Sequence, residues 1–406
     1  MLKYMNSNIS LFFFFFFLAA VSMAENSEER ILKKAIIENG FKSPEDLYIS
    51  KDSNLTSVGK LFFQSKNLSL NGRISCATCH ISTKGSSDGI PNAAGVQGYG
   101  EGKDRLLSGA KIVPRNTLGL WGVGSKGFKT FFWDGRIDFS EEDIVSQFGK
   151  AIPSNDPLIT AVHLPVVEIR ETLEEDDFIL AHKQESIDGA DAVYSAILKN
   201  LKENEKDAIK QLSQNTGKKI EELVFLDIAK SLAAFIRNEF KIKNTPLNSF
   251  VVGKKKLTEK QIKGGLIFYG KGNCISCHSG SNFTNQKFYT VPFPQLGFGK
   301  NGFGIDYGRY NATFNPNDLY KFRTPSLYNN GLTSPYGHSG SASDLYESIK
   351  AHFDPLSMVE LSHYTPHQRF QFYKYLTKND TADKVKYITD NEIELLIEFL
   401  GTMNFD

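Results

Sequence analysis

The sequence contains Cys76-Ala77-Thr78-Cys79-His80, and the same pattern returns as Cys274-Ile275-Ser276-Cys277-His278. These two stretches use all 4 cysteines of the 406-residue chain, so no thiol remains for a disulfide framework. Cys-x-x-Cys-His is the attachment pattern of c-type haem, in which two thiols bind the vinyl groups and the histidine becomes the proximal iron ligand. The sequence therefore predicts two covalently bound haem c groups. Their predicted binding residues are Cys76, Cys79, His80, Cys274, Cys277 and His278.

A redox motif, a zinc site and local disulfides each account for the cysteines less well. A thioredoxin-like redox motif needs one Cys-x-x-Cys in a βαβ setting, and neither copy has such a setting. A four-cysteine zinc site would join pairs from distant parts of the chain and would leave both adjacent histidines without a role. A disulfide closed within each Cys-x-x-Cys would be a poor structural staple. Haem attachment alone accounts for the thiols and the histidines together.

Residues 1–24 are typical of a secretory signal. Lys3 supplies the positive charge, an apolar run extends from Leu11 to Ala20, and Ser22-Met23-Ala24 offers the small residues that a signal peptidase reads. The apolar run is shorter than the ~20 residues that span a bilayer, and no later segment is long and apolar enough. We therefore expect a periplasmic protein with no membrane span. With 47 basic and 46 acidic side chains, the chain also lacks the basic excess typical of nucleic-acid binding.

The rest of the sequence predicts a mostly α fold made of two cytochrome c-like domains with long loops and one c-type haem each. Apolar spacing predicts a helix over residues 28–39 and helical structure over 186–240. The basic stretch 241–256 contains Pro246 and Gly253 and is typical of a linker. We therefore expect the domains at residues 25–242 and 243–406.

Two further helices are marked by their first residues. Thr258 with Gln261, and Thr389 with Glu392, have the spacing of a capping box. A short internal repeat also precedes each haem motif, as Gly59-Lys60-Leu61-Phe62 and as Gly265-Leu266-Ile267-Phe268.

Longer stretches around the motifs resemble the bacterial di-haem cytochrome c peroxidase and MauG family, over roughly residues 58–400. The stretches that carry the resemblance are 59–80, Pro114-Arg115-Asn116-Thr117, Phe132-Trp133-Asp134-Gly135-Arg136, Phe322-Arg323-Thr324-Pro325-Ser326-Leu327 and 332–338. The resemblance implies a peroxidatic N-terminal haem, a C-terminal haem that transfers electrons, and a calcium ion near the interface of the two domains.

The resemblance also implies the function. The leading hypothesis is a periplasmic peroxidase that reduces hydrogen peroxide with electrons from a small cytochrome c or a cupredoxin. The first alternative is a MauG-like enzyme that oxidises residues of a partner protein. The second alternative is a non-enzymatic di-haem electron carrier. The oligomeric state stays open, with a homodimer as one option.

The sixth ligands of the two haem irons decide what each haem can do. In the family, a Met or Tyr seven residues after a leucine closes the second haem, and counting from Leu345 reaches His352. We therefore predict that His278 and His352 both bind the second iron, with Met358 as the rival ligand. No histidine occurs between His80 and His163, where many family peroxidases carry a ligand that blocks the first haem. The first haem is accordingly expected to be five-coordinate.

The family resemblance implies catalytic roles for Glu171 and Trp133. Glu171 lies six residues after Pro165, at the family position of the proton-shuttling carboxylate, and Glu168 is the alternative. The family's distal glutamine is replaced by Ala161, and His163 is a candidate for part of that role. Trp133 matches a tryptophan that lies between the two haems and relays electrons.

The resemblance also implies a calcium site. Its ligands would be the Asn116 side chain and the backbone carbonyls of Arg323 and Pro325. His338 lies in a family motif, and we expect its ring to bind a haem propionate or a loop carbonyl.

Overall fold

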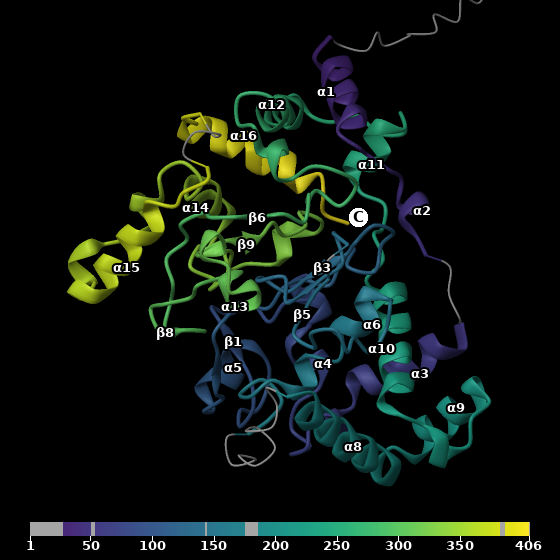
Figure 1. The fold of residues 1–406 in the computed structure, drawn as a ribbon. Coiled ribbons are helices and arrows are strands. Elements are labelled where there is room, and N and C mark those ends of the chain that lie inside the picture. Colours follow the sequence, from purple (N-terminus) through teal and green to yellow (C-terminus); the bar gives the residue numbers. More distant parts are fainter. Residues whose placement is uncertain (1–26, 50–52, 143, 175–185, 382–385, 406) are drawn as a thin grey trace, which may run out of the picture.

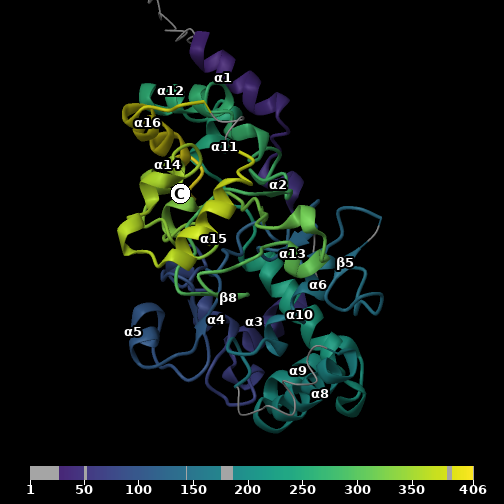
Figure 2. The ribbon, with the colours of Figure 1, turned by 60° about the vertical axis from the view of Figure 1, so that its left-hand side comes forward.

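The structure is a computed structural model that describes residues 27–49, 53–142, 144–174, 186–381 and 386–405. The expected secretory signal at residues 1–24 lies outside the described residues. Helices dominate the fold, and each β-strand is only two residues long, which confirms the mostly α class. In Figures 1 and 2, the described residues between 53 and 240 lie below most of the C-terminal half, whereas residues 27–38 lie at the top.

The helices of the N-terminal half surround the first haem motif. They are α3 (Ser53–Gln64), α4 (Cys76–Cys79), α5 (Gly102–Leu107), α6 (Pro157–Ala161), α8 (Ile187–Asn204), α9 (Lys206–Thr216) and α10 (Phe225–Glu239). The helices of the C-terminal half are α11 (Pro246–Val251), α12 (Glu259–Tyr269), α13 (Tyr310–Thr313), α14 (Leu345–Lys350), α15 (Pro366–Leu376) and α16 (Asp390–Gly401). Two helices precede them, α1 (Ser27–Glu38) and α2 (Pro44–Leu47).

Short antiparallel ladders fasten the loops between the helices. In the N-terminal half, β1 (Ala93–Ala94) pairs with β2 (Ile112–Val113), and β3 (Thr130–Phe131), β4 (Ile137–Asp138) and β5 (Val145–Ser146) form a small sheet. In the C-terminal half, β6 (Phe288–Tyr289) pairs with β9 (Phe322–Arg323), and β7 (Phe298–Gly299) pairs with β8 (Gly302–Phe303).

Each half is built on one close helix crossing that needs a glycine. A Cβ atom on Gly59 in α3 would lie 1.9 Å from the carbonyl oxygen of Ser231 in α10. A Cβ atom on Gly264 in α12 would lie 1.9 Å from the carbonyl oxygen of Leu395 in α16. Because glycine has no Cβ, the paired backbones come into direct contact in both halves.

The crossings correct the register of the internal repeat. The sequence pattern pairs Gly59 with Gly265, but the structural equivalent of Gly59 is Gly264. Phe63 then corresponds to Phe268, whose ring centroid lies 5.4 Å from the ring of Phe399. The Phe63 ring lies at a similar 5.0 Å from that of Phe235. The sequence pattern is misleading because only one glycine of the pair Gly264-Gly265 contacts the backbone of the neighbouring helix. The sequence alone does not show which of the two it is.

Two hydrophobic clusters follow the two halves, with two departures from expectation. The sequence places the segment before residue 48 in the first half, but Leu32, Ile36 and Leu47 pack in the cluster of the second half. The predicted linker contains α11, whose Leu247 and Phe250 are buried in the same cluster. Its basic residues are therefore the exposed part of a segment that also supplies core.

The remaining local predictions are confirmed. Helix α1 ends before Gly40, which has a positive φ of 87°. The capping boxes of α12 and α16 are both formed. Within the described part of the chain, no helix combines the length and the apolar character needed to cross a membrane.

The helix crossings give a first prediction. Gly59→Ala and Gly264→Ala should each lower the free energy of unfolding by about 1–3 kcal/mol or more, because the added methyl forces two backbones apart. Gly401→Ala is the matched control, since a Cβ there meets nothing within 4 Å. Urea unfolding of the haem-loaded protein measures all three variants. Equal, small effects at the three sites would contradict the proposed role of the crossings.

Candidate haem sites

The first motif forms a single helical turn that presents His80. The His80 backbone N–H donates to the Cys76 carbonyl at 3.0 Å, and ring atom Nδ1 lies 2.9 Å from the carbonyl oxygen of Ser86. A hydrogen bond at Nδ1 fixes the tautomer and leaves Nε2 for a metal. Burial lowers the pKa of His80, which favours the neutral imidazole that metal binding requires.

Glu171 lies beside the first motif and is partly buried. Burial, with the nearby charge of Glu168 as a second cause, raises the pKa of Glu171 to about 7. The carboxyl is close enough to the motif that, after burial itself, its charge contributes to raising the thiol pKa of Cys76 to about 12. Glu168 differs, because it is ion-paired with Arg136. Of the two candidate carboxyls, Glu171 is therefore the one poised to exchange a proton near neutral pH.

The loop opposite Glu171 is held by Arg105. Its guanidinium donates to the carbonyl oxygens of Ala94 at 3.0 Å, Gly98 at 2.8 Å and Gly95 at 2.5 Å. Gly95 itself abuts the backbone before Glu171, since a Cβ there would lie 1.7 Å from the carbonyl oxygen of Arg170. The contact fixes the position of the Glu171 backbone relative to the motif loop.

A buried series of ion pairs joins the two halves of the protein. Arg115 donates to both carboxylate oxygens of Asp306 at 2.8 Å and to Asp134 at 2.6 Å. Asp134 also accepts from Arg136 at 3.2 Å, and Arg136 reaches Glu168. Although burial alone would raise it, Arg115 and Arg136 hold the pKa of Asp134 well below its usual range. This series of ion pairs therefore extends from Asp306 in the second half to Glu168, which lies near the first motif.

A large cavity of about 240 Å³ lies beside the second motif. Both halves of the chain line it, mostly with apolar side chains. The lining includes all the predicted ligands of the second haem together with two tryptophans: Cys274, Cys277, His278, His352, Trp121 and Trp133.

His278 and His352 face this cavity in the same manner. Nδ1 of His278 lies 3.1 Å from the Phe283 carbonyl oxygen, and Nδ1 of His352 lies 2.8 Å from the Ser348 carbonyl oxygen. Each ring therefore keeps Nε2 for another partner. Burial, and then the charge of His352, lowers the pKa of His278 to about 4, and both rings line the same cavity. Met358 instead packs with the cluster around Phe293 and is not among the described residues that line the cavity.

An unsatisfied polar atom in the cavity fits a bound haem. Trp121 Nε1 is a buried donor on a residue that lines the cavity, and it has no hydrogen-bond partner in the described part of the chain. A buried group left in that state costs about 1–3 kcal/mol. A haem propionate would accept a hydrogen bond from the indole, and the apolar walls suit the macrocycle. The residues present therefore fit the cofactor that the motif predicts.

Trp133 lies between the two halves. Its indole N–H donates to the Asn116 carbonyl at 2.9 Å, and its own carbonyl accepts from the backbone N–H of Arg323 at 2.8 Å. It lines the cavity and packs against a small aromatic cluster that includes Phe322. This is the position that a relay residue would need.

His163 and Ala161 lie in the core of the first half. The His163 ring packs within 5.3 Å of the rings of Tyr194 and Phe225, and its Nδ1 lies 2.7 Å from the Ile159 carbonyl oxygen. The suggestion that His163 replaces part of the distal network is therefore corrected: its ring is a core residue with a local partner.

The three residues predicted to bind calcium line the same cavity. Asn116 donates through Nδ2 to the Pro335 carbonyl at 2.6 Å, which leaves Oδ1 available. Amide and carbonyl oxygens are suitable calcium donors, and Arg323 and Pro325 also line the cavity. No cluster of three His, Cys, Asp or Glu residues that could hold a metal occurs within the described ranges.

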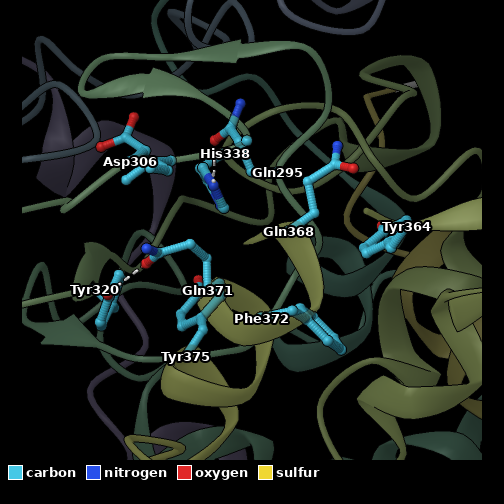
Figure 3. Close-up of a pocket in the computed structure, with 11 residues that line it drawn as sticks. Gln295, Asp306, Tyr320, His338, Tyr364, Gln368, Gln371, Phe372 and Tyr375 are labelled. Carbon is cyan, nitrogen blue, oxygen red and sulfur yellow. Dashed lines mark hydrogen bonds between the residues drawn. The ribbon is translucent and has the colours of Figure 1, made fainter. Parts of the chain in front are cut away.

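His338 differs from expectation. Its Nε2 lies 3.0 Å from Oε1 of the Gln295 side chain, and its ring stacks on Phe322 with centroids 3.9 Å apart. The ring separates the large cavity from a smaller polar pocket that contains Asp306 and Tyr375 (Figure 3). The protein partner of its ring is thus a side-chain amide and not a loop carbonyl, and the expected contact with a haem propionate stays a prediction.

Comparison with known proteins places the chain in a family. A family model described as di-haem cytochrome c peroxidase matches residues 53–256. The chain belongs to this family and is an oxidoreductase of the kind that uses peroxide.

Two relatives and one solved structure illustrate the similarity. The methylamine utilization protein MauG of Methylorubrum extorquens is 26% identical over 82% of this chain and 78% of its own length. The cytochrome c551 peroxidase of Pseudomonas aeruginosa is 25% identical over 72% of this chain and 69% of its own length. The diheme peroxidase BthA of Burkholderia thailandensis has the same fold, with a TM-score of 0.64 at 16% identity over 90% of this chain and 89% of its own.

The geometry of the second cavity gives a prediction. His352→Ala should convert the second haem from a low-spin to a high-spin iron, because the imidazole Nε2 that would bind the iron is lost. Added imidazole should restore the low-spin signal. Met358→Leu is the control and should leave the signal unchanged. EPR and absorption spectra of the oxidised protein measure both. A spectral change in Met358→Leu alone would identify the thioether as the ligand.

Proposed function

We propose that the protein reduces hydrogen peroxide in the periplasm, with electrons from a small cytochrome c or a cupredoxin. Residues 25–242 would hold the peroxidatic haem and residues 243–406 the electron-transfer haem. One observation carries the proposal: a carboxyl with a pKa of about 7, Glu171, lies beside the first motif, whereas two histidines line the cavity beside the second motif. This asymmetry matches one site that handles protons and one that passes electrons.

The first site supplies the acid–base chemistry. Haem c, when bound at Cys76, Cys79 and His80, provides the iron at which peroxide is cleaved. The Glu171 carboxylate would accept a proton from one oxygen of peroxide and return it to the other oxygen, so that breakage of the O–O bond releases that oxygen as water. Two electrons from the donor and two further protons from solvent would convert the remaining oxygen to the second water. A group whose pKa lies near the working pH performs both transfers well. Arg105 and Gly95 keep the backbone of this region fixed.

The second site is suited to electron transfer. The imidazoles of His278 and His352 would both bind the iron of the second haem, which would leave no ligand position for peroxide there. Two imidazoles also give a lower potential than an imidazole with a thioether. Trp133, between the halves, would relay electrons from the second site to the first.

A MauG-like oxidation of a partner protein is the second candidate. It is favoured by the absence of a histidine between His80 and His163 and by His352 in place of a thioether. Both features would stabilise the oxidised state of the haem irons, and neither would speed the delivery of electrons from a donor. The third hypothesis, a non-enzymatic carrier, does not agree with membership of an enzyme family.

A peroxide titration tests the proposal. Purified haem-loaded protein with a reduced small cytochrome should oxidise many equivalents of donor for each enzyme molecule when peroxide is added. A stable doubly oxidised enzyme without donor turnover would support the MauG-like alternative. An absence of peroxide consumption would contradict both.

The raised pKa of Glu171 predicts a pH dependence. The carboxylate is the proton acceptor, so the rate of peroxide cleavage should rise as pH increases through about 7 and then level off. Glu171→Gln should lower the rate by about 10²–10⁴-fold and remove this inflection. Stopped-flow kinetics measure both effects.

One further variant and a measurement of stability check the sign. Glu168→Gln should move the inflection to lower pH, because it removes a negative neighbour and frees the positive charge of Arg136. Since folding raises the Glu171 pKa, the wild type loses stability as pH rises through 7, and Glu171→Gln should be the more stable protein above that pH. An unchanged inflection in Glu171→Gln would assign the titration to another group.

We also propose that calcium binds at Asn116 and at the carbonyls of Arg323 and Pro325. Removal of calcium by EGTA should lower the melting temperature, and calcium at 100 times its dissociation constant should restore about 2.7 kcal/mol. Asn116→Ala should abolish this response, whereas Asn116→Asp should keep it. A response that persists in Asn116→Ala would place the ion elsewhere.

A further inference from the structure

Four tyrosines of the second half form a continuous line of ring contacts. Tyr375 lies 5.4 Å from Tyr320, Tyr320 lies 5.9 Å from Tyr307, and Tyr307 lies 6.0 Å from Tyr310, measured between ring centroids. Each spacing is within the range of aromatic rings in contact. Electron tunnelling falls off exponentially with distance, so a series of contact-length steps is faster than one long step.

The inner end of this line reaches the wall of the large cavity. Tyr375 lies 6.2 Å from the ring of His338, which stacks on Phe322 and lines the cavity itself. Trp133 packs against the same aromatic cluster as Tyr320 and Tyr375. Figure 3 shows Tyr320, Tyr375 and His338 around the small polar pocket next to this wall.

The outer end of the line reaches the protein surface. Tyr310 begins α13 and is partly exposed. Its ring lies 6.1 Å from that of Phe314, whose side chain is 75% exposed. The four tyrosines therefore lead from the buried wall to solvent.

The proton acceptors along the line set a direction. A tyrosine that loses an electron also releases its phenolic proton. The Tyr375 hydroxyl donates to the Val291 carbonyl at 2.6 Å, and the Tyr320 hydroxyl donates to Oε1 of Gln371 at 3.4 Å. Both acceptors are neutral and very weak bases, so neither holds the proton well. At the partly exposed Tyr310, water can accept it.

We propose that Tyr375, Tyr320, Tyr307 and Tyr310 conduct oxidising equivalents from the haem cavity to the surface, where small dissolved reductants neutralise them. The inference rests on the proposed reaction with peroxide, which is the oxidant. For each equivalent, one electron moves inward along the line and Tyr310 releases its proton to water. A phenol or ascorbate then gives Tyr310 one electron and one proton. Two such events supply the two electrons and two protons that convert one peroxide to two waters.

Oxidative mapping tests the line. Haem-loaded protein receives stoichiometric peroxide without a donor, and peptide mass spectrometry then locates oxidised residues, while freeze-quench EPR detects tyrosyl radicals. We expect oxidation concentrated at Tyr310, suppressed when ascorbate is present. In Tyr320→Phe, which keeps the ring but cannot form a stable phenoxyl, oxidation at Tyr310 should fall about tenfold or more. Oxidation should then accumulate at Tyr375 and Trp133.

A matched control and a second variant complete the test. Tyr373→Phe removes a tyrosine that is 48% exposed and lies outside the line, so the wild-type pattern should persist. Tyr307→Phe should reproduce the effect of Tyr320→Phe. It takes the place of Tyr320→Phe if that variant folds poorly. Peroxide consumption is followed in parallel. If the wild type consumes peroxide but Tyr310 is labelled equally in Tyr320→Phe, only the line is overturned; if it consumes none, the proposed function falls and the line falls with it.

Discussion

The backbone contacts at Gly59 and Gly264 are the constraint on which the rest of the structure depends. Each brings an early helix against a late helix of its half, and each haem motif follows the early helix after a short connecting segment. A close crossing of this kind leaves no room for a side chain, so the helix pair has one geometry. The loops that carry the ligands and the acidic residues are attached to these two rigid pairs, and long irregular segments keep their positions for that reason.

The two halves share this scaffold but differ in the chemistry of their sites. The first site has a partly buried carboxyl, Glu171, and a network of charged residues that leads away from it. The second site is lined by apolar walls and two neutral imidazoles, His278 and His352. Burial produces opposite effects in the two places, since it raises the pKa of a carboxyl and lowers that of a histidine. One scaffold can thus provide a proton-handling site and a site without mobile protons.

Much of the fold could be predicted from sequence because its determinants are local. The haem motifs, the helix ends and the capping boxes at Thr258 and Thr389 are each contained within a few residues. Helix α11 was missed because its two core residues, Leu247 and Phe250, lie within a basic stretch. The bridge from Arg115 to Asp306 joins residues 191 positions apart, and a single sequence contains no signal for such a contact. The tyrosine line is likewise not predictable from sequence, since α15 supplies Tyr375, whereas α13 and its flanking loops, more than 50 positions earlier, supply the others.

The packing of α1 has a consequence for biogenesis. This first helix joins a core whose other members, apart from Phe41 and Leu47, follow residue 241, and it contacts α12 (Figure 1). Residues 32–47 can therefore complete their packing only after the chain beyond residue 241 has been made. The N-terminal half has its own hydrophobic cluster, to which α1 contributes nothing, and it can collapse in the meantime. The second core is thus the last to close, because it combines an early segment of the chain with the late helices.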